Sequence, residues 1–166
     1  MPVGRPPRLA ALLLALAAGA LVAATGGCAD VTRDVAGPRP SPELSARDVV
    51  SLQLAALSRG DDEALAVALR FASPGNRAGI GEAEGFRQLL AGPLYGPLIG
   101  HRDAHVGPEE ALPGHVGIPV EITAADGRRV QYLYLLRRQA APGCENCWLI
   151  DAVSPFTGDV PRGIRT

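Results

Sequence analysis

The first half of the chain repeats apolar residues at helical spacing. Between residues 42 and 59 they form one stripe, as in a helix with a single buried face: Val49, Val50, Leu54 and Leu57. The segment Ser41–Glu43 supplies an N-cap serine, a proline for the first helical position and an acid for the first turn. We therefore predict a helix that begins at Pro42 and ends before Gly60.

Three shorter helices are predicted after this one. Asp61 can cap a helix over residues 62–71, and Ser73 followed by proline can begin a short helical turn. After a glycine-rich break, residues 82–91 present Phe86 and two leucines at helical spacing before the chain reaches Gly92. The helices thus end before residue 93.

The second half changes to strict alternation, which is typical of strands that are buried on one face. We predict four strands, over residues 101–106, 114–124, 128–139 and 147–154. Asp126-Gly127 predicts a two-residue hairpin between the second and third of them. Pro119 has no backbone N–H to donate to a neighbouring strand, so its own strand should be an edge at this position or carry a bulge.

The alternation also predicts which residues share a face. One face of the second and third strands should carry these side chains: Val116, Ile118, Val120, Ile122, Val130, Tyr132, Tyr134 and Leu136. In the fourth strand, Ile150 and Ala152 should face one way, and Asp151 and Val153 the other. Helices followed by a strand meander indicate an α+β domain whose helices pack on one face of an antiparallel sheet.

Composition narrows the functional classes. The chain has 16 basic and 17 acidic residues, so no charge excess would attract nucleic acid. Every basic residue is arginine, and the absence of lysine excludes Schiff-base chemistry and Walker-type phosphate binding. We predict no cofactor, no metal and no nucleic-acid partner.

The N-terminus resembles a bacterial lipoprotein signal. Arg5 and Arg8 precede 16 apolar residues, 9–24, which is shorter than the roughly 20 needed to span a bilayer. Cys28 follows small residues, as in a lipobox, although Thr25 stands where an aliphatic residue is usual. We predict a signal peptide over 1–27, a lipid anchor on Cys28 at the extracytoplasmic face of the membrane, a tether over 28–41, the domain over 42–156 and a tail over 157–166. Cleavage without lipid, giving a secreted or periplasmic protein, and an uncleaved anchor are the alternatives.

Two cysteines lie in the last predicted turn. A four-residue turn holds its end Cα atoms within about 7 Å, so Cys144 and Cys147 can form a disulfide, which persists outside the cytoplasm. A redox pair and half of a zinc site are the alternatives. The sequence continues as strand rather than helix after Cys147, and no second ligand pair is evident.

Histidines offer the only candidate base. His101, Asp103 and His105 alternate along one predicted strand and would share a face, where they could present two imidazoles and a carboxylate to a metal or act as an acid/base pair. An exposed edge strand needs polar residues as well, so a solvated edge explains the same pattern. His115 has no evident partner in the sequence.

Several segments together resemble a known family. They are Gln53, the Gly60-Asp61 break, Phe71-Ala72-Ser73-Pro74 with Arg77, the helix around Phe86, Tyr95 and Trp148-Leu149-Ile150-Asp151. In this order they resemble the bacterial family called domain of unknown function 4864, over roughly residues 48–153. That family is similar in fold to the nuclear-transport-factor-two-like superfamily, although the cysteine pair departs from its pattern.

The resemblance implies a curved four-stranded sheet wrapped round the helices as a cone, often dimeric through the sheet and with a cavity at its mouth. Gln53, Tyr95, Tyr132, Tyr134 and Trp148 would then line the cavity, unless the glutamine and the aromatic residues only fill the core. Arg77 would contact a ligand or act as a structural clamp.

The function predicted from the sequence is a binding or accessory module of the cell envelope that holds a small apolar ligand. Superfamily members include isomerases and dehydratases, so one alternative is an enzyme of the isomerase or hydratase kind that uses His101 or His105 near Asp103. Another is a structural lipoprotein that dimerises through its sheet. Fold alone does not choose among them.

Overall fold

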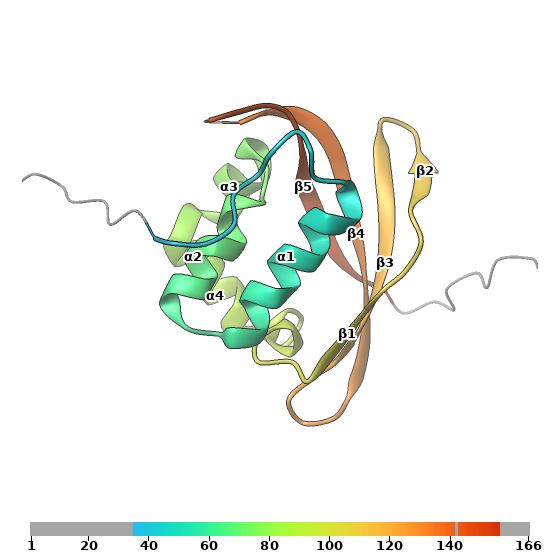
Figure 1. Cartoon of the computed structure of the whole chain (residues 1–166). Coiled ribbons are helices and arrows are strands. Elements are labelled where there is room, and N and C mark those ends of the chain that lie inside the picture. Colours follow the sequence, from blue (N-terminus) through green and yellow to red (C-terminus); the bar gives the residue numbers. More distant parts are fainter. Residues whose placement is uncertain (1–34, 142, 157–166) are drawn as a thin grey trace, which may run out of the picture. The chain divides into compact units, whose positions relative to one another are not determined.

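The computed structural model describes residues 35–141 and 143–156 of the chain. The predicted signal peptide, Cys28 and the C-terminal tail lie outside the described residues. Four α-helices and a single-turn 3-10 helix precede the strands (Figure 1): α1 (Ala46–Arg59), α2 (Asp62–Arg70), α3 (Pro74–Ile80), α4 (Glu82–Ala91) and η1 (Gly96–Leu98).

The first helix begins later than the sequence predicted. Ser45, not Ser41, is the N-cap of α1, and it forms a capping box with Asp48. The Ser45 hydroxyl accepts from the Asp48 N–H at 3.1 Å, while Oδ2 of Asp48 accepts from the Ser45 N–H at 2.9 Å. Two backbone donors are thus satisfied reciprocally, which the segment around Pro42 could not achieve with a lone serine. At its other end α1 stops at Gly60 in the left-handed conformation, as predicted.

The strands form one antiparallel sheet in the order β1-β3-β4-β5, and the short strand β2 also pairs with β3. Their bounds are β1 (Asp103–Val106), β2 (Glu110–Leu112), β3 (His115–Thr123), β4 (Arg129–Ala141) and β5 (Cys144–Phe156). The long strands β4 and β5 curl around the helices, which all lie on the concave side of the sheet (Figure 1). The predicted α+β class with a curved antiparallel sheet is confirmed.

Pro119 does not lie in an edge strand, but the strand pairing beside it is interrupted. β3 is an interior strand, with β1 and β2 on one side and β4 on the other. The pairing with β1 ends at Val120, and the pairing with β2 begins at Gly117. In the gap, the Gly107 N–H donates to the Pro119 carbonyl at 2.8 Å, while the proline offers no N–H in return. The missing donor therefore accounts for the separate strand β2, which the sequence analysis did not predict.

A bulge in β5 changes which side chains of its last residues point toward the helices. Leu136 pairs with Ile150 and Leu135 with Ala152, so Asp151 is the extra residue. Beyond it the alternation is inverted, and Val153 pairs with Tyr134 on the concave face. The prediction that Ala152 shares a face with Ile150 was therefore wrong.

The core lies between the concave face of the sheet and α1 with α2. Its largest fully buried side chains come from both layers: Val49, Val50, Leu57, Phe71, Ile118, Val120, Ile122, Tyr132, Tyr134, Leu136 and Ile150. Six of the eight predicted inward residues of the second and third strands are among them, and the other two, Val116 and Val130, are partly buried against the same core, which confirms the alternation. Cys144 and Cys147 form the predicted disulfide, with Cα atoms 6.0 Å apart, within the usual range of about 4.4–6.8 Å.

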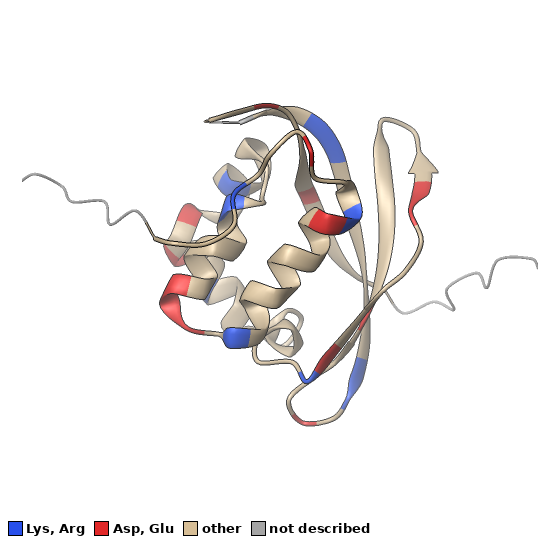
Figure 2. Cartoon of the chain, viewed as in Figure 1, with Lys and Arg blue, Asp and Glu red and all other residues tan. Residues whose placement is uncertain are grey.

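Charged residues of both signs are spread over the helices and the strands (Figure 2). Within the described ranges, no helix has the length and apolar character that crossing a membrane requires. The convex face of the sheet carries Leu133 and Leu135, both half-buried, between polar residues. Dimerisation through this face stays a prediction.

Candidate functional site

A cavity of about 270 Å³ lies between α1, α3, α4 and the concave face of β4 and β5, and we call it the cone cavity. Most of its lining is apolar and includes Leu57, Phe86 and Leu90. Its polar lining comes from four residues: Gln53, Asn76, Tyr95 and Tyr134. None of the described residues that line it carries a charge. Apolar walls with a few placed polar groups are typical of small-molecule sites.

Gln53 enters the cavity from the apolar stripe of α1. Its side chain is only 3% exposed, and its Nε2 donates to the Ala68 carbonyl of α2 at 3.1 Å. A carbonyl can only accept, so this bond fixes which end of the amide is nitrogen. The Oε1 atom is therefore the end that Gln53 retains for a ligand. Gln53 thus lines the cavity and also satisfies a backbone carbonyl of the core, so its position fits both interpretations of this glutamine.

Asn76, which the sequence analysis missed, is arranged in the same way. Ser73 caps α3 and accepts from the Asn76 N–H at 3.1 Å. Next to this cap, Ala72 bridges to Ile150 of β5, and the Nδ2 of Asn76 donates to the Ile150 carbonyl at 3.1 Å. The amide nitrogen is therefore committed to the sheet edge, and Oδ1 is the end that remains. No local pattern could have indicated this contact across 74 residues.

Tyr134 forms the floor of the cavity from β4. Its side chain is fully buried, and its hydroxyl is the one buried side-chain polar atom without a hydrogen-bond partner in the part of the chain that the structure describes. Burial, and then the neighbouring Tyr132, raise the pKa of the Tyr134 hydroxyl, so the group stays protonated and can donate. Leaving such a group without a partner costs about 1–3 kcal/mol.

Two tyrosines hold the connection between α4 and η1 in place. Tyr95 donates to the Val153 carbonyl at 2.9 Å, and Tyr132 donates to the Leu94 carbonyl at 2.8 Å. Their rings are stacked with centroids 6.3 Å apart, so Tyr132 supports Tyr95 from behind. Burial, and then the nearby Tyr95, raise the pKa of Tyr132 to about 12. Tyr95 is among the residues that line the cavity, whereas Tyr132 is not.

These contacts predict opposite effects for two tyrosine hydroxyls on the same strand. Tyr132→Phe should lower the free energy of unfolding by about 1 kcal/mol, because it removes a hydrogen bond that is made. Tyr134→Phe should raise it by up to about 1 kcal/mol, because it removes a buried donor that has no partner. Urea unfolding of both variants measures the difference. An equal loss in both would contradict the assignment of Tyr134 as unpartnered.

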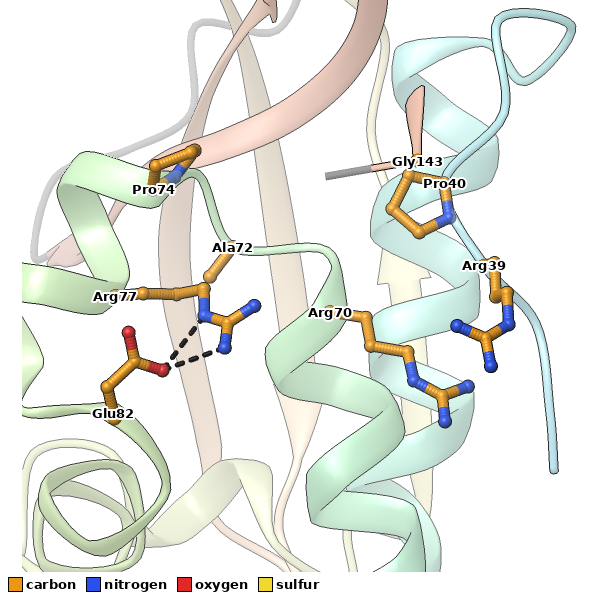
Figure 3. A pocket seen from close by; sticks show the side chains of 8 residues that line it. All are labelled: Arg39, Pro40, Arg70, Ala72, Pro74, Arg77, Glu82 and Gly143. Carbon is orange, nitrogen blue, oxygen red and sulfur yellow. Dashed lines mark hydrogen bonds and ion pairs between the residues drawn. The ribbon is translucent and has the colours of Figure 1, made fainter. Parts of the chain in front are cut away.

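A second hollow of about 470 Å³ lies beside α2 and α3 and is lined by three arginines (Figure 3). Arg77 donates through Nε and Nη2 to Oε2 of Glu82, at 3.1 and 2.8 Å. Arg70 donates to backbone carbonyls of Val35, Gly37 and Pro38 and so holds the N-terminal segment against α2. Arg39 lies with Arg70 on the side away from Glu82. Since Arg70 and Arg77 serve the fold in this way, we place the candidate site in the cone cavity.

The histidine candidates and Asp103 do not line the cone cavity. Asp103 and His105 are exposed on β1 and pair with Thr123 and Glu121. His101 precedes that strand, with Nδ1 2.8 Å from the Leu98 carbonyl. None of the three is among the residues that line the cavity.

Trp148 also lies outside the cavity lining. It packs half-buried against the core, with the Arg138 guanidinium 5.2 Å from its ring centroid. Within residues 35–141 and 143–156, no group of three or more His, Cys, Asp or Glu side chains is placed to hold a metal.

Asp151 organises a polar cluster on the convex face. Its carboxylate lies 3.1 Å from Nε2 of His115, accepts from Gln139 at 2.9 Å and pairs with Arg137. The expectation that His115 lacks a partner was therefore wrong. Burial acts to raise the pKa of Asp151, but hydrogen bonds from Gln139 and Ser73, the charge of Arg137 and a hydrogen bond from His115 together lower it.

Two of the segments that carry the family resemblance, 71–74 and 148–151, meet beside this cluster. The Ser73 N–H donates to the Ile150 carbonyl at 2.9 Å, and the Ile150 N–H donates to the Phe71 carbonyl at 2.8 Å. These bonds pair the segment 71–73 with the edge of β5, which would otherwise expose unpaired backbone groups. They also set α3, and with it Asn76, against the sheet.

The fold and its cavity define a small α+β domain in which helices close the concave side of a curved sheet. Residues 41–158 match the family described as Domain of unknown function (DUF4864), and the chain belongs to this family. Comparisons with curated proteins and with solved structures found no match.

Proposed function

We propose that this protein is a binding module that holds a small, largely apolar molecule in the cone cavity. We further propose that the module is exported and attached to the cell envelope by a lipid on Cys28. The observation that carries the binding proposal is the Tyr134 hydroxyl, a protonated donor without a partner at the floor of a mostly apolar cavity. A ligand that accepts this hydrogen bond would remove a cost that the unliganded fold bears.

The chemistry of the lining supports binding rather than proton transfer. General acid–base catalysis is most efficient when the catalytic pKa lies near the working pH. The polar side chains that line the cavity are two amides and two phenols, and burial moves the pKa of the Tyr134 phenol further from neutrality. Such groups orient a ligand by hydrogen bonds without exchanging protons with it.

Two sequence features support the location. The segment before Cys28 has the pattern of a lipoprotein signal, and the disulfide between Cys144 and Cys147 is of a kind that persists outside the cytoplasm. An extracytoplasmic module with an apolar cavity could bind a small molecule that partitions between water and lipid.

Blocking the cavity tests the proposal. Val153 faces the cavity from β5, so Val153→Trp should fill it, whereas Ser154 is exposed on the same strand and Ser154→Trp is the matched control. The full chain is titrated with toluene, and binding is measured from the methyl NMR signals of Leu57 and Leu90. We expect toluene to shift these signals in the wild type and in Ser154→Trp but not in Val153→Trp. Unshifted cavity methyls in the wild type at millimolar toluene would refute the binding proposal.

A further inference from the structure

We infer that the cone cavity selects a neutral molecule with a primary carboxamide head on a short apolar body, and discriminates against the carboxylate of the same shape. This inference rests on the proposed binding function and adds the chemical class of the ligand. It follows from which polar atoms of the lining are already committed and which remain.

Two of the remaining atoms are acceptors of fixed orientation. Gln53 and Asn76 each give their amide nitrogen to a backbone carbonyl, at 3.1 Å in both cases. If either amide turned over, its oxygen would face the oxygen of that carbonyl, and two acceptors cannot form a hydrogen bond. Oε1 and Oδ1 are therefore the atoms that each side chain offers. A ligand at these positions must bring N–H or O–H donors.

The third atom is a donor. Tyr134 keeps its proton and has no partner, whereas the Tyr95 proton is already used by the Val153 carbonyl. The lining therefore offers one free donor and two oriented acceptors. A primary carboxamide has the complementary set, since its oxygen accepts one bond and its nitrogen donates two.

Charge completes the selection. The described lining residues carry no charge, so an ion entering the cavity would lose its hydration without gaining a counter-ion. A carboxylate would in addition meet the two amide oxygens with no proton to give them. An ammonium group could satisfy the oxygens, but it could not accept the proton of Tyr134 and would also lie without a counter-ion.

Volume limits the apolar body. The cavity of about 270 Å³ equals the volume of about nine water molecules in the liquid, at roughly 30 Å³ each. A head of three heavy atoms therefore leaves room for a chain or ring of about five or six carbons. Hexanamide is the probe that fits this estimate, and hexanoate is its charged counterpart of the same shape.

The test compares hexanamide, hexanoate and toluene on the full chain at pH 7, with methyl NMR of Leu57 and Leu90 as the readout. We expect hexanamide to bind at least about tenfold more tightly than hexanoate. Tyr134→Phe should weaken hexanamide binding by about tenfold, which corresponds to one lost hydrogen bond, and leave toluene binding unchanged. Tyr132→Phe is the control, because the hydroxyl of Tyr132 donates to the Leu94 carbonyl. This variant should keep the preference for hexanamide.

The outcomes separate the two proposals. If toluene shifts the cavity methyls while hexanoate binds as tightly as hexanamide, the carboxamide inference is overturned and the binding module stands. A Tyr134→Phe variant that weakens toluene and hexanamide equally also overturns the inference, because the hydroxyl would then act only on the shape of the cavity. If none of the three probes shifts the methyls, both proposals fail.

Discussion

Gly85→Ala should lower the free energy of unfolding by about 3 kcal/mol, because the tight junction between α3 and α4 has no room for a methyl group. A Cβ at position 85 would lie 1.7 Å from the Ile80 carbonyl oxygen and 2.8 Å from its carbon. Both are backbone atoms, so no rotamer change can relieve the overlap. The junction is already constrained, with Gly81 and Glu82 both at positive φ.

Gly79→Ala is the matched control in the preceding helix. A Cβ at position 79 meets nothing within 4 Å, and the residue lies inside α3. Alanine there should raise the free energy of unfolding by about 0.5 kcal/mol, because it restricts the unfolded chain more than the helix. Urea unfolding, read by far-UV circular dichroism, measures both variants. Similar values for the two alanines would show that the junction adjusts and is not tight.

The junction between α3 and α4 also positions residues that line the cone cavity. Ile80 ends α3 and Phe86 lies in α4, and both contact the cone cavity. A shift of α4 away from α3 in Gly85→Ala should therefore also weaken toluene binding. Gly79→Ala should leave toluene binding unchanged.

Asp151→Asn should lower the free energy of unfolding by about 2 kcal/mol at pH 7, because it removes the charge that attracts Arg137 while keeping the size of the side chain. The carboxylate is well covered, with its side chain 14% exposed, and hydrogen bonds from His115 and Gln139 converge on it. Its loss would loosen the bulge that directs Val153 toward the cavity.

The pH dependence of this difference follows from the direction of the pKa shift. The pKa of Asp151 in the folded protein lies below its ordinary value of 3.8. The carboxylate therefore stabilises the fold above pH 3.8, and this stabilisation is lost as the pH falls through the lowered pKa. The gap between wild type and Asp151→Asn should shrink over that range.

Asp103→Asn is the control for surface charge. Asp103 is exposed on β1, so its substitution should change the free energy of unfolding by less than about 0.5 kcal/mol. Chemical denaturation at pH 7 and at several values below 4 provides the comparison. A gap between wild type and Asp151→Asn that stays constant down to the lowest pH would mean that the charge of Asp151 contributes nothing.

The sequence alone determined those features that depend on near neighbours. The change from helical to alternating spacing located the boundary between helices and sheet, and alternation placed Tyr132 and Tyr134 on the concave face. A hairpin forms at Asp126-Gly127, but its loop has three residues instead of the predicted two, because the Ala124 N–H donates to the Arg128 carbonyl at 2.8 Å and the Gly127 N–H to the Ala124 carbonyl at 2.9 Å. These features follow from periodicity and turn chemistry within about ten residues, which a single sequence displays.

Only the tertiary structure decided where competing or distant groups meet. Ser41 and Ser45 both fit an N-cap, and the reciprocal bond to Asp48 selected the second. The bulge at Asp151 inverted the facing of Val153, and no local signal marks it because His115 and Gln139 reach it from other strands. The cavity likewise depends on which atoms are left unpaired once α1, α3 and β4 pack together, and that is a property of the packing rather than of any one segment.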